Sequence, residues 1–255
     1  MESESAFNDA TGSILTFTIL GIVLGTSTWS ITASAFSFIK MAGGGIGIGL
    51  LTGWMTAVLI SERYGFLRDY PAIAYITAAI GSYFTADQLG FSGFMATFTS
   101  GVLLGNHEAL GLRQSDEKLS AVVHVFDGIT LMMRMLIFVL LGTQVNLGAL
   151  KTYWLPGLGI VAVFMLIARP LTVLACTLPD RKAKWRWNEI LFMFWIRETG
   201  VIPAALVGLI AGMGVAHMEA IASVTFMAIL ITIVLQAGTT AWVAGKLGLI
   251  IGERR

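Results

Sequence analysis

The chain has 255 residues, of which 56% are hydrophobic and 12% are charged, with a formal net charge of +1 at pH 7. A soluble domain usually carries about twice that charged fraction, so the composition excludes an ordinary soluble protein and predicts an integral membrane protein. The small net charge argues against a nucleic acid or an acidic partner. The one cysteine, Cys176, excludes an intrachain disulfide and argues against a metal cluster.

The predicted fold is all-α, because a membrane-spanning helix needs about 20 mostly apolar residues and the sequence offers about eight such runs. In chain order they cover residues 4–26, 33–60, 71–86, 90–106, 122–143, 154–178, 188–211 and 219–244. The third and fourth runs are short, and only ADQLG separates them, so we expect a tight hairpin there. The chain starts with acidic residues where a secretory signal peptide would start with basic ones, so we expect no cleavable signal.

The lysines and arginines predict the orientation of these spans. Of the 16, eleven lie in loops on the side of the two termini, one lies on the other side and four lie inside predicted spans. Cytoplasmic loops carry the excess of positive charge, so both termini are expected in the cytoplasm, with the chain in the plasma (inner) membrane. We interpret RKAKWRW, between the sixth and seventh spans, as a topology signal rather than a lipid site.

The first span begins with polar side chains in ESAFNDATG. Glu4 and Asn8 are four residues apart and share a helix face, and so do Ser5 and Asp9. A carboxylate flanked by an amide and a hydroxyl offers oxygen ligands to a hard monovalent cation, and a proton competes for the same carboxylate. The residues alone leave a second interpretation open. In it, Glu4 and Asp9 lie at a solvent-exposed helix N-terminus and complement the helix dipole.

Two further features precede the sixth span. The stretch MAGGGIGIGLLTG, after Lys40, is dense in glycine and lacks the Gly-Lys-Ser/Thr of a phosphate loop, so it predicts close helix packing or a flexible linker helix. Asp127 and Arg134 lie seven residues apart on the fifth span. We interpret them as structural charges that pair with other helices.

Arg169 lies in the middle of the sixth span, in FMLIARPLTVLAC. Pro170 follows it and frees a backbone carbonyl one turn back. Arg169 is too deep for its side chain to reach the surface, so we expect an acidic partner, and Glu4 and Asp9 are the best placed. A purely structural ion pair is the alternative.

The seventh span is interrupted within FWIRETGVIPAALVG. Arg197 and Glu198 stand there between apolar segments, and Gly200 and Pro203 follow. A short charged break bounded by glycine and proline is typical of a discontinuous helix at an ion site. A simple kink is the alternative.

Several of these motifs resemble one family. ESAFNDATG resembles the Glu-Ser-x-x-Asn-Asp signature of sodium/proton antiporters in the cation:proton antiporter superfamily. Further helices of that family resemble, in the same order, SGFMATFTSGVLLGN, ARPLTV, RETGVIPAAL and LITIVLQAGTTAW. The resemblance covers nearly the whole chain and implies part of an inverted-repeat antiporter fold. Residues 1–26 would be the last core helix of a first repeat, 27–66 a linker helix, and 67–255 the second repeat.

The resemblance also implies roles for residues. Asp9 would bind the cation or the proton, with Asn8 and Ser5 beside it, and Glu4 would pair with Arg169 to brace the site. Arg197 would lie on the crossing, unwound helix. The Asn-Asp pair resembles the branch that exchanges one cation for one proton, so the cycle would be electroneutral. No cofactor is implied; Na⁺, with K⁺ or Li⁺ possible, and H⁺ are the transported ions, and the full-length form would be a homodimer.

Departures from the family keep other interpretations open. The first spans of the family pattern are missing, so the chain is a candidate for a half-transporter or a non-functional fragment that needs a separate N-terminal half. Glu198 stands where many family members have glycine, which leaves ion choice and stoichiometry open. A remote alternative is a rhomboid-like intramembrane serine protease, on the pattern Gly90-Phe91-Ser92-Gly93 with His124 or His217 as base.

Overall fold

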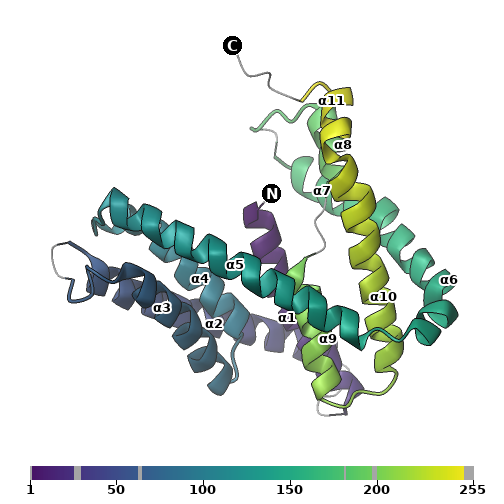
Figure 1. Ribbon diagram of the computed structural model, residues 1–255, viewed down its shortest axis with the longest axis horizontal. Helices are drawn as coiled ribbons and strands as arrows, with labels where there is room; N and C mark the ends of the chain where they lie inside the picture. Colours follow the sequence, from purple (N-terminus) through teal and green to yellow (C-terminus); the bar gives the residue numbers. More distant parts are fainter. Residues whose placement is uncertain (1, 26–29, 63–64, 181, 197–199, 250–255) are drawn as a thin grey trace. The chain divides into compact units, whose positions relative to one another are not determined.

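The computed structural model describes residues 2–25, 30–62, 65–180, 182–196 and 200–249, and in these residues the secondary structure is helical throughout (Figure 1). The elements are α1 (Glu2–Val23), α2 (Ile31–Ile60), α3 (Pro71–Gln88), α4 (Gly93–Gly105), η1 (His107–Leu110), α5 (Asp116–Gln144), α6 (Leu147–Val163), η2 (Phe164–Ala168), α7 (Arg169–Thr177), α8 (Trp187–Trp195), α9 (Val201–Gly212), α10 (Met218–Ile231), η3 (Thr232–Ala237) and α11 (Gly238–Lys246). The predicted all-α fold class is confirmed.

Each of the eight predicted spans overlaps helical residues of the structure. Among the described residues, four segments are long and apolar enough to cross a membrane by length and composition: Thr32–Ile60, Glu117–Thr143, Leu147–Thr177 and Met218–Lys246. Three apolar helices are shorter: Phe7–Val23, Gly93–Gly105 and Val201–Gly212. The predicted span 188–211 is divided between α8 and α9, because the helix ends at Trp195 and a new helix starts at Val201.

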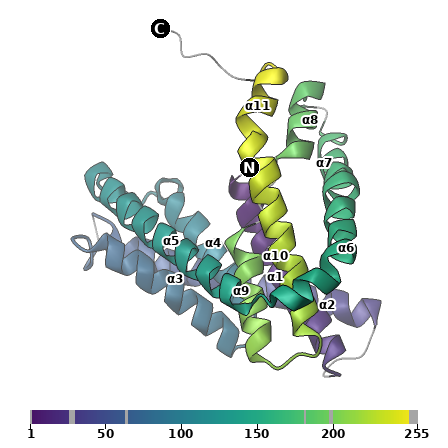
Figure 2. The same ribbon diagram turned by 45° about the vertical axis from the view of Figure 1, so that its right-hand side comes forward.

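The chain divides into two compact units, residues 1–134 and 135–255, which are described separately. The first unit contains α1 to α4 and most of α5. The second contains the end of α5 and α6 to α11. In the second unit, α6 continues through η2 into α7, and α10 continues through η3 into α11 (Figure 2).

Glycines on one face of α2 set the packing of the first unit. Gly45, Gly49 and Gly53 recur every four residues and therefore lie above one another on the helix. A Cβ added at Gly49 would lie 2.3 Å from the carbonyl oxygen of Ala96, and one added at Gly53 would lie 3.0 Å from that of Ser100. The backbones of α2 and α4 are thus in direct contact, as small residues permit in membrane proteins. The glycine-dense stretch is a close-packing surface.

The hairpin between α3 and α4 is as tight as the sequence predicts. Gly90 adopts a left-handed conformation, with φ +74°, in the turn between the two helices. The Ser92 hydroxyl accepts a hydrogen bond from the Met95 N–H and caps the first turn of α4. Within the hairpin, the buried Ser82 hydroxyl lies 3.3 Å from the Thr97 hydroxyl.

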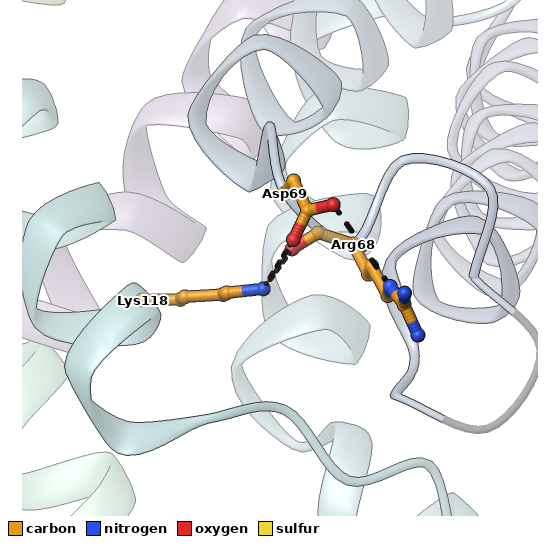
Figure 3. Close-up of polar contacts among 3 residues, drawn as sticks. All are labelled: Arg68, Asp69 and Lys118. Carbon is orange, nitrogen blue, oxygen red and sulfur yellow. Dashed lines mark hydrogen bonds and ion pairs between the residues drawn. The ribbon is translucent and has the colours of Figure 1, made fainter.

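A polar contact fastens the loop before α3 to the start of α5 (Figure 3). The Lys118 ammonium donates to Asp69 Oδ1 at 2.8 Å and to the Arg68 carbonyl at 2.9 Å. The Arg68 Nε atom lies 3.9 Å from Asp69 Oδ2. The hydrogen bond and the charge of Lys118 hold the pKa of the Asp69 carboxyl below its ordinary value of 3.8.

The second unit is built around α10. Five buried residues from α5, α9 and α10 form its apolar core: Leu141, Ala204, Val207, Ala222 and Ile229. On the α6 side, Gly157 lies against Met227, since an added Cβ would approach the Met227 methyl carbon to 2.6 Å. Both long helical runs of this unit contain a π-helical turn, Phe164–Ala168 in one and Thr232–Ala237 in the other.

Replacing Gly49 by alanine should destabilise the packing of α2 on α4, because the new methyl group and the Ala96 carbonyl cannot both keep their positions. Overpacking of this kind usually costs about 1–3 kcal/mol. We therefore expect the melting temperature of the purified protein in detergent to fall by a few degrees. Gly47→Ala is the matched control on the same helix, since nothing lies within 4 Å of its added Cβ. Equal losses in both variants would contradict the packing role.

Replacing Lys118 by methionine should remove a pH-dependent part of the stability. The folded-state pKa of Asp69 is lowered, so its contribution is present above the ordinary pKa of 3.8 and is lost as the pH falls through the lower folded value. The difference in melting temperature between wild type and Lys118→Met should therefore be constant near neutral pH and shrink below pH 3.8. Arg68→Met should change this pH dependence less, and a difference that does not depend on pH would refute the assignment.

Candidate functional site

Helix α1 places Asn8 and Asp9 at the edge of its buried face. Ala10 and Ile14 are only 3% and 1% exposed and belong to an apolar cluster with Met95 of α4. Asp9 precedes this buried stripe and is half-buried, whereas Asn8 is exposed. The Asp9 side chain is therefore neither fully buried nor fully exposed.

The hydroxyl groups that follow on α1 are engaged with their own helix. They donate to backbone carbonyls three or four residues earlier at 2.7–2.8 Å, and they belong to Thr11, Ser13, Thr16 and Thr18. Each of these hydroxyls donates its proton within its own helix, and its oxygen lone pairs remain available as acceptors. Among the described side chains of this segment, Asp9 supplies the one carboxylate and Asn8 the one amide.

Part of the predicted site lies outside the described part of the chain. The backbone of Glu4 and Ser5 is helical, but their side chains are not among those described, so neither the Ser5–Asp9 neighbourhood nor the pairing of Glu4 with Arg169 is tested. Arg197 and Glu198 also lie outside the described residues. These assignments stay predictions.

Arg169 is buried in an otherwise apolar span, with 5% of its surface exposed. Its side chain donates hydrogen bonds to backbone carbonyls. Its Nε donates to the Met193 carbonyl at 3.0 Å and its Nη2 donates to the Ile196 carbonyl at 3.1 Å. Both acceptors lie at the C-terminal end of α8, where the last carbonyls of a helix have no partner within the helix. The sequence predicts an acidic partner for Arg169, and it gave no sign of these two carbonyls.

The discontinuity predicted in the seventh span is confirmed. Helix α8 has nine residues and α9 has twelve, so neither crosses a bilayer alone. Gly200 directly precedes α9, and Pro203 lies in its first turn, where the missing proline N–H removes no hydrogen bond. The C-terminus of α8 and the N-terminus of α9 flank the break, and helix ends of this kind carry partial charges that can act on ions.

A second side-chain contact reaches the end of α8 from α11. The Trp195 indole N–H donates to the Thr239 hydroxyl oxygen at 2.8 Å. Deeper in the same helical run, the buried Thr232 hydroxyl donates to the Ala228 carbonyl. The Gln236 amide oxygen is buried without a hydrogen-bond partner among the residues that the structure describes. Sequence reasoning missed these polar groups, since isolated threonines and a glutamine in an apolar run carry no spacing signal.

Taken separately, the two units offer different chemistry. The first offers the half-buried carboxylate of Asp9. The second offers a broken helix whose loose carbonyls are bonded by a buried guanidinium. Among the described residues, no group of three or more histidine, cysteine, aspartate or glutamate side chains could hold a metal ion.

Comparison with known proteins gives a consistent result. A family profile described as "Sodium/hydrogen exchanger, transmembrane" matches residues 1–246. The low-affinity Na⁺/H⁺ antiporter NhaS1 of Synechocystis is 28% identical over 98% of this chain and 48% of its own length. The K⁺/H⁺ antiporter NhaP2 of Shewanella oneidensis is 27% identical over 94% of this chain and 40% of its own length.

Two comparisons concern Methanocaldococcus jannaschii. Its Na⁺/H⁺ antiporter 1 is 30% identical over 97% of this chain and 61% of its own length. The solved structure of the sodium proton antiporter MjNhaP1 from this organism at pH 8 superposes with a TM-score of 0.80 and 28% identity, over 94% of this chain and 61% of the other. The chain thus spans about half the length of the curated relatives that it matches.

Proposed function

The chain belongs to the sodium/hydrogen exchanger family, and on that basis we propose that it exchanges a monovalent cation for protons across a membrane by alternating access. The observation that supports this most strongly is the position of Asp9, a half-buried carboxylate on α1 within the motif that resembles the family signature. A proton and a hard cation compete for such a carboxylate, and this competition is the basis of exchange. The protein is therefore proposed to be a transporter and not an enzyme.

The proposed cation is Na⁺, with K⁺ and Li⁺ as alternatives. The relatives' own names include both Na⁺/H⁺ and K⁺/H⁺ antiporters, so membership in the family does not choose between these ions. Oxygen ligands suit all of them. We propose that Asn8 and Ser5 assist Asp9, and that no cofactor takes part.

The proposed cycle has two halves. Asp9 releases a proton on one side of the membrane and binds the cation, and the core helices then move and expose the site to the other side. One positive charge replaces another on the same carboxylate, as in the Asn-Asp branch that the motif resembles, so the exchange is electroneutral. Glu4 is proposed to pair with Arg169 and brace the site.

The broken helix is proposed as the second part of the ion site. Its residues are Arg197, Glu198, Gly200 and Pro203. The described ends of α8 and α9 support this, since they leave backbone carbonyls and helix termini at the interruption. Free helix ends of opposite polarity stabilise an ion without adding a full opposite charge.

We also propose the organisation that the resemblance implies. Residues 1–26 are the last core helix of one repeat, 27–66 a linker helix and 67–255 a second, inverted repeat. The membrane is the plasma (inner) membrane with both termini of this chain in the cytoplasm, as the distribution of lysine and arginine supports. The full-length form is a homodimer.

A second candidate is a half-transporter or fragment that works only beside further helices. It is supported by the share of the relatives that the chain covers, 48% of NhaS1 and 40% of NhaP2. The relatives reported above are named as antiporters, and they give the protease alternative no support. Ser92, its candidate nucleophile, caps α4 through the Met95 N–H and is 5% exposed.

Replacing Asp9 by asparagine should abolish exchange, because the amide keeps the shape of the side chain but cannot take up a proton or hold a full negative charge. The assay uses liposomes that contain the purified chain, a pH gradient and an internal pH-sensitive dye. Adding Na⁺ or K⁺ should dissipate the gradient in wild type, and the rate in Asp9→Asn should fall to that of empty liposomes.

Asp87→Asn is the matched control, since this exposed aspartate near the end of α3 undergoes the same chemical change away from the proposed site. It should retain the wild-type rate. An Asp9→Asn variant that exchanges cations as fast as wild type would sink the assignment. Absence of exchange in the wild-type chain alone, with exchange restored by co-expressed N-terminal helices of a relative, would favour the half-transporter.

A further inference from the structure

Two π-helical turns stand directly before the residues that contact the end of α8. The turn Phe164–Ala168 immediately precedes Arg169. The turn Thr232–Ala237 ends two residues before Thr239. A π turn contains one residue more than an α turn. Every side chain after it is therefore rotated by about 100° relative to an uninterrupted α-helix.

Arg169 meets the end of α8 from one side. Its fork of N–H groups donates to two carbonyls, those of Met193 and Ile196, at 3.0 and 3.1 Å. These carbonyls lie at the end of α8, where intrahelical donors run out. Its positive charge lies at the negative end of the α8 dipole, where a cation is favourable. The same side chain therefore provides hydrogen bonds and charge to one helix end.

Thr239 meets α8 from another element. The Thr239 hydroxyl donates its own proton to the Leu235 carbonyl, so its oxygen lone pairs remain available as acceptors. One of them accepts the Trp195 indole N–H at 2.8 Å. Trp195 is the last residue of α8. The end of α8 is thus held through its backbone by α7 and through its last side chain by α11.

We propose that the two π turns aim Arg169 and Thr239 at the end of α8, and that these two residues form a clamp that fixes the geometry of the helix break. Conversion of either π turn to α-helix would rotate its residue away from α8 and release that side of the clamp. Arg169 and Thr239 are therefore positioning residues that act on an ion through the helix end and not by touching it. The effect on transport rests on the proposed function, whereas the clamp itself does not.

The clamp is tested first by distances between spin labels, without any ion gradient. Cys176 on α7 is exposed, and it is the one cysteine of the chain, so it accepts a nitroxide label directly. A second label at Leu191→Cys, an exposed position of α8, reports the separation of α7 and α8. Arg169→Lys should broaden this distance distribution, because an ammonium keeps the charge but lacks the planar fork that bonds two carbonyls at once.

The α11 side is tested with labels at Leu191→Cys and Ala241→Cys in a Cys176→Ser background. Thr239→Val and Trp195→Phe should each broaden the distribution. The double variant should broaden it no further, because both changes remove the same hydrogen bond between Trp195 and Thr239. Thr239→Ser should restore the narrow distribution. Thr240→Val is the matched control, since the Thr240 hydroxyl donates within its own helix to the Gln236 carbonyl, and it should leave the distribution unchanged.

Transport supplies the functional readout. In the liposome assay, Thr239→Val should raise the half-saturating cation concentration by about tenfold, the effect of one lost hydrogen bond, with a smaller change in maximal rate. Wild-type distances for Thr239→Val, additive effects in the double variant, or equal broadening by Thr240→Val would overturn the clamp. Failure of the wild-type chain to exchange ions would instead count against the proposed function, because the distance measurements need no transport.

Discussion

The broken helix depends on one constraint, which is that backbone carbonyls inside a bilayer need hydrogen-bond donors. A helix that ends at Trp195 has no further helical turn to supply donors for its last carbonyls. The buried Arg169 provides donors for two of them, at Met193 and Ile196. A buried guanidinium and a broken helix would each be costly alone. Each feature lowers the cost of the other, because the guanidinium gains two acceptors and the two carbonyls gain donors.

Two further features of the second unit lie at the same end of α8. The helix that carries Arg169 has a π turn directly before it, and α11 contacts α8 through the Trp195–Thr239 hydrogen bond. The departure from α-helical geometry before Arg169 thus lies next to a residue that bonds to the end of α8. In the first unit, glycines of α2 pack directly against the backbone of α4.

The sequence predicted features that depend on local chemistry. Apolar runs located the helices, Gly200 and Pro203 located the break, and the Asn8-Asp9 motif pointed to the family that the comparisons then established. The hydrogen-bond partners of Arg169 could not be predicted from the sequence, because every residue type has a backbone carbonyl that can accept. The π turns were equally hidden, since the segments 164–168 and 232–237 have ordinary apolar sequences and adopt this conformation in their tertiary context.

The glycine face of α2 has a consequence for the entropy of the first unit. Gly45, Gly49 and Ala96 have no rotatable side-chain bonds, so their contact immobilises no rotamers when the helices meet. In a bilayer, burial of apolar surface does not drive helices together, because lipid tails are as apolar as leucine. The α2–α4 pair therefore gains its dispersion contacts almost without a conformational penalty.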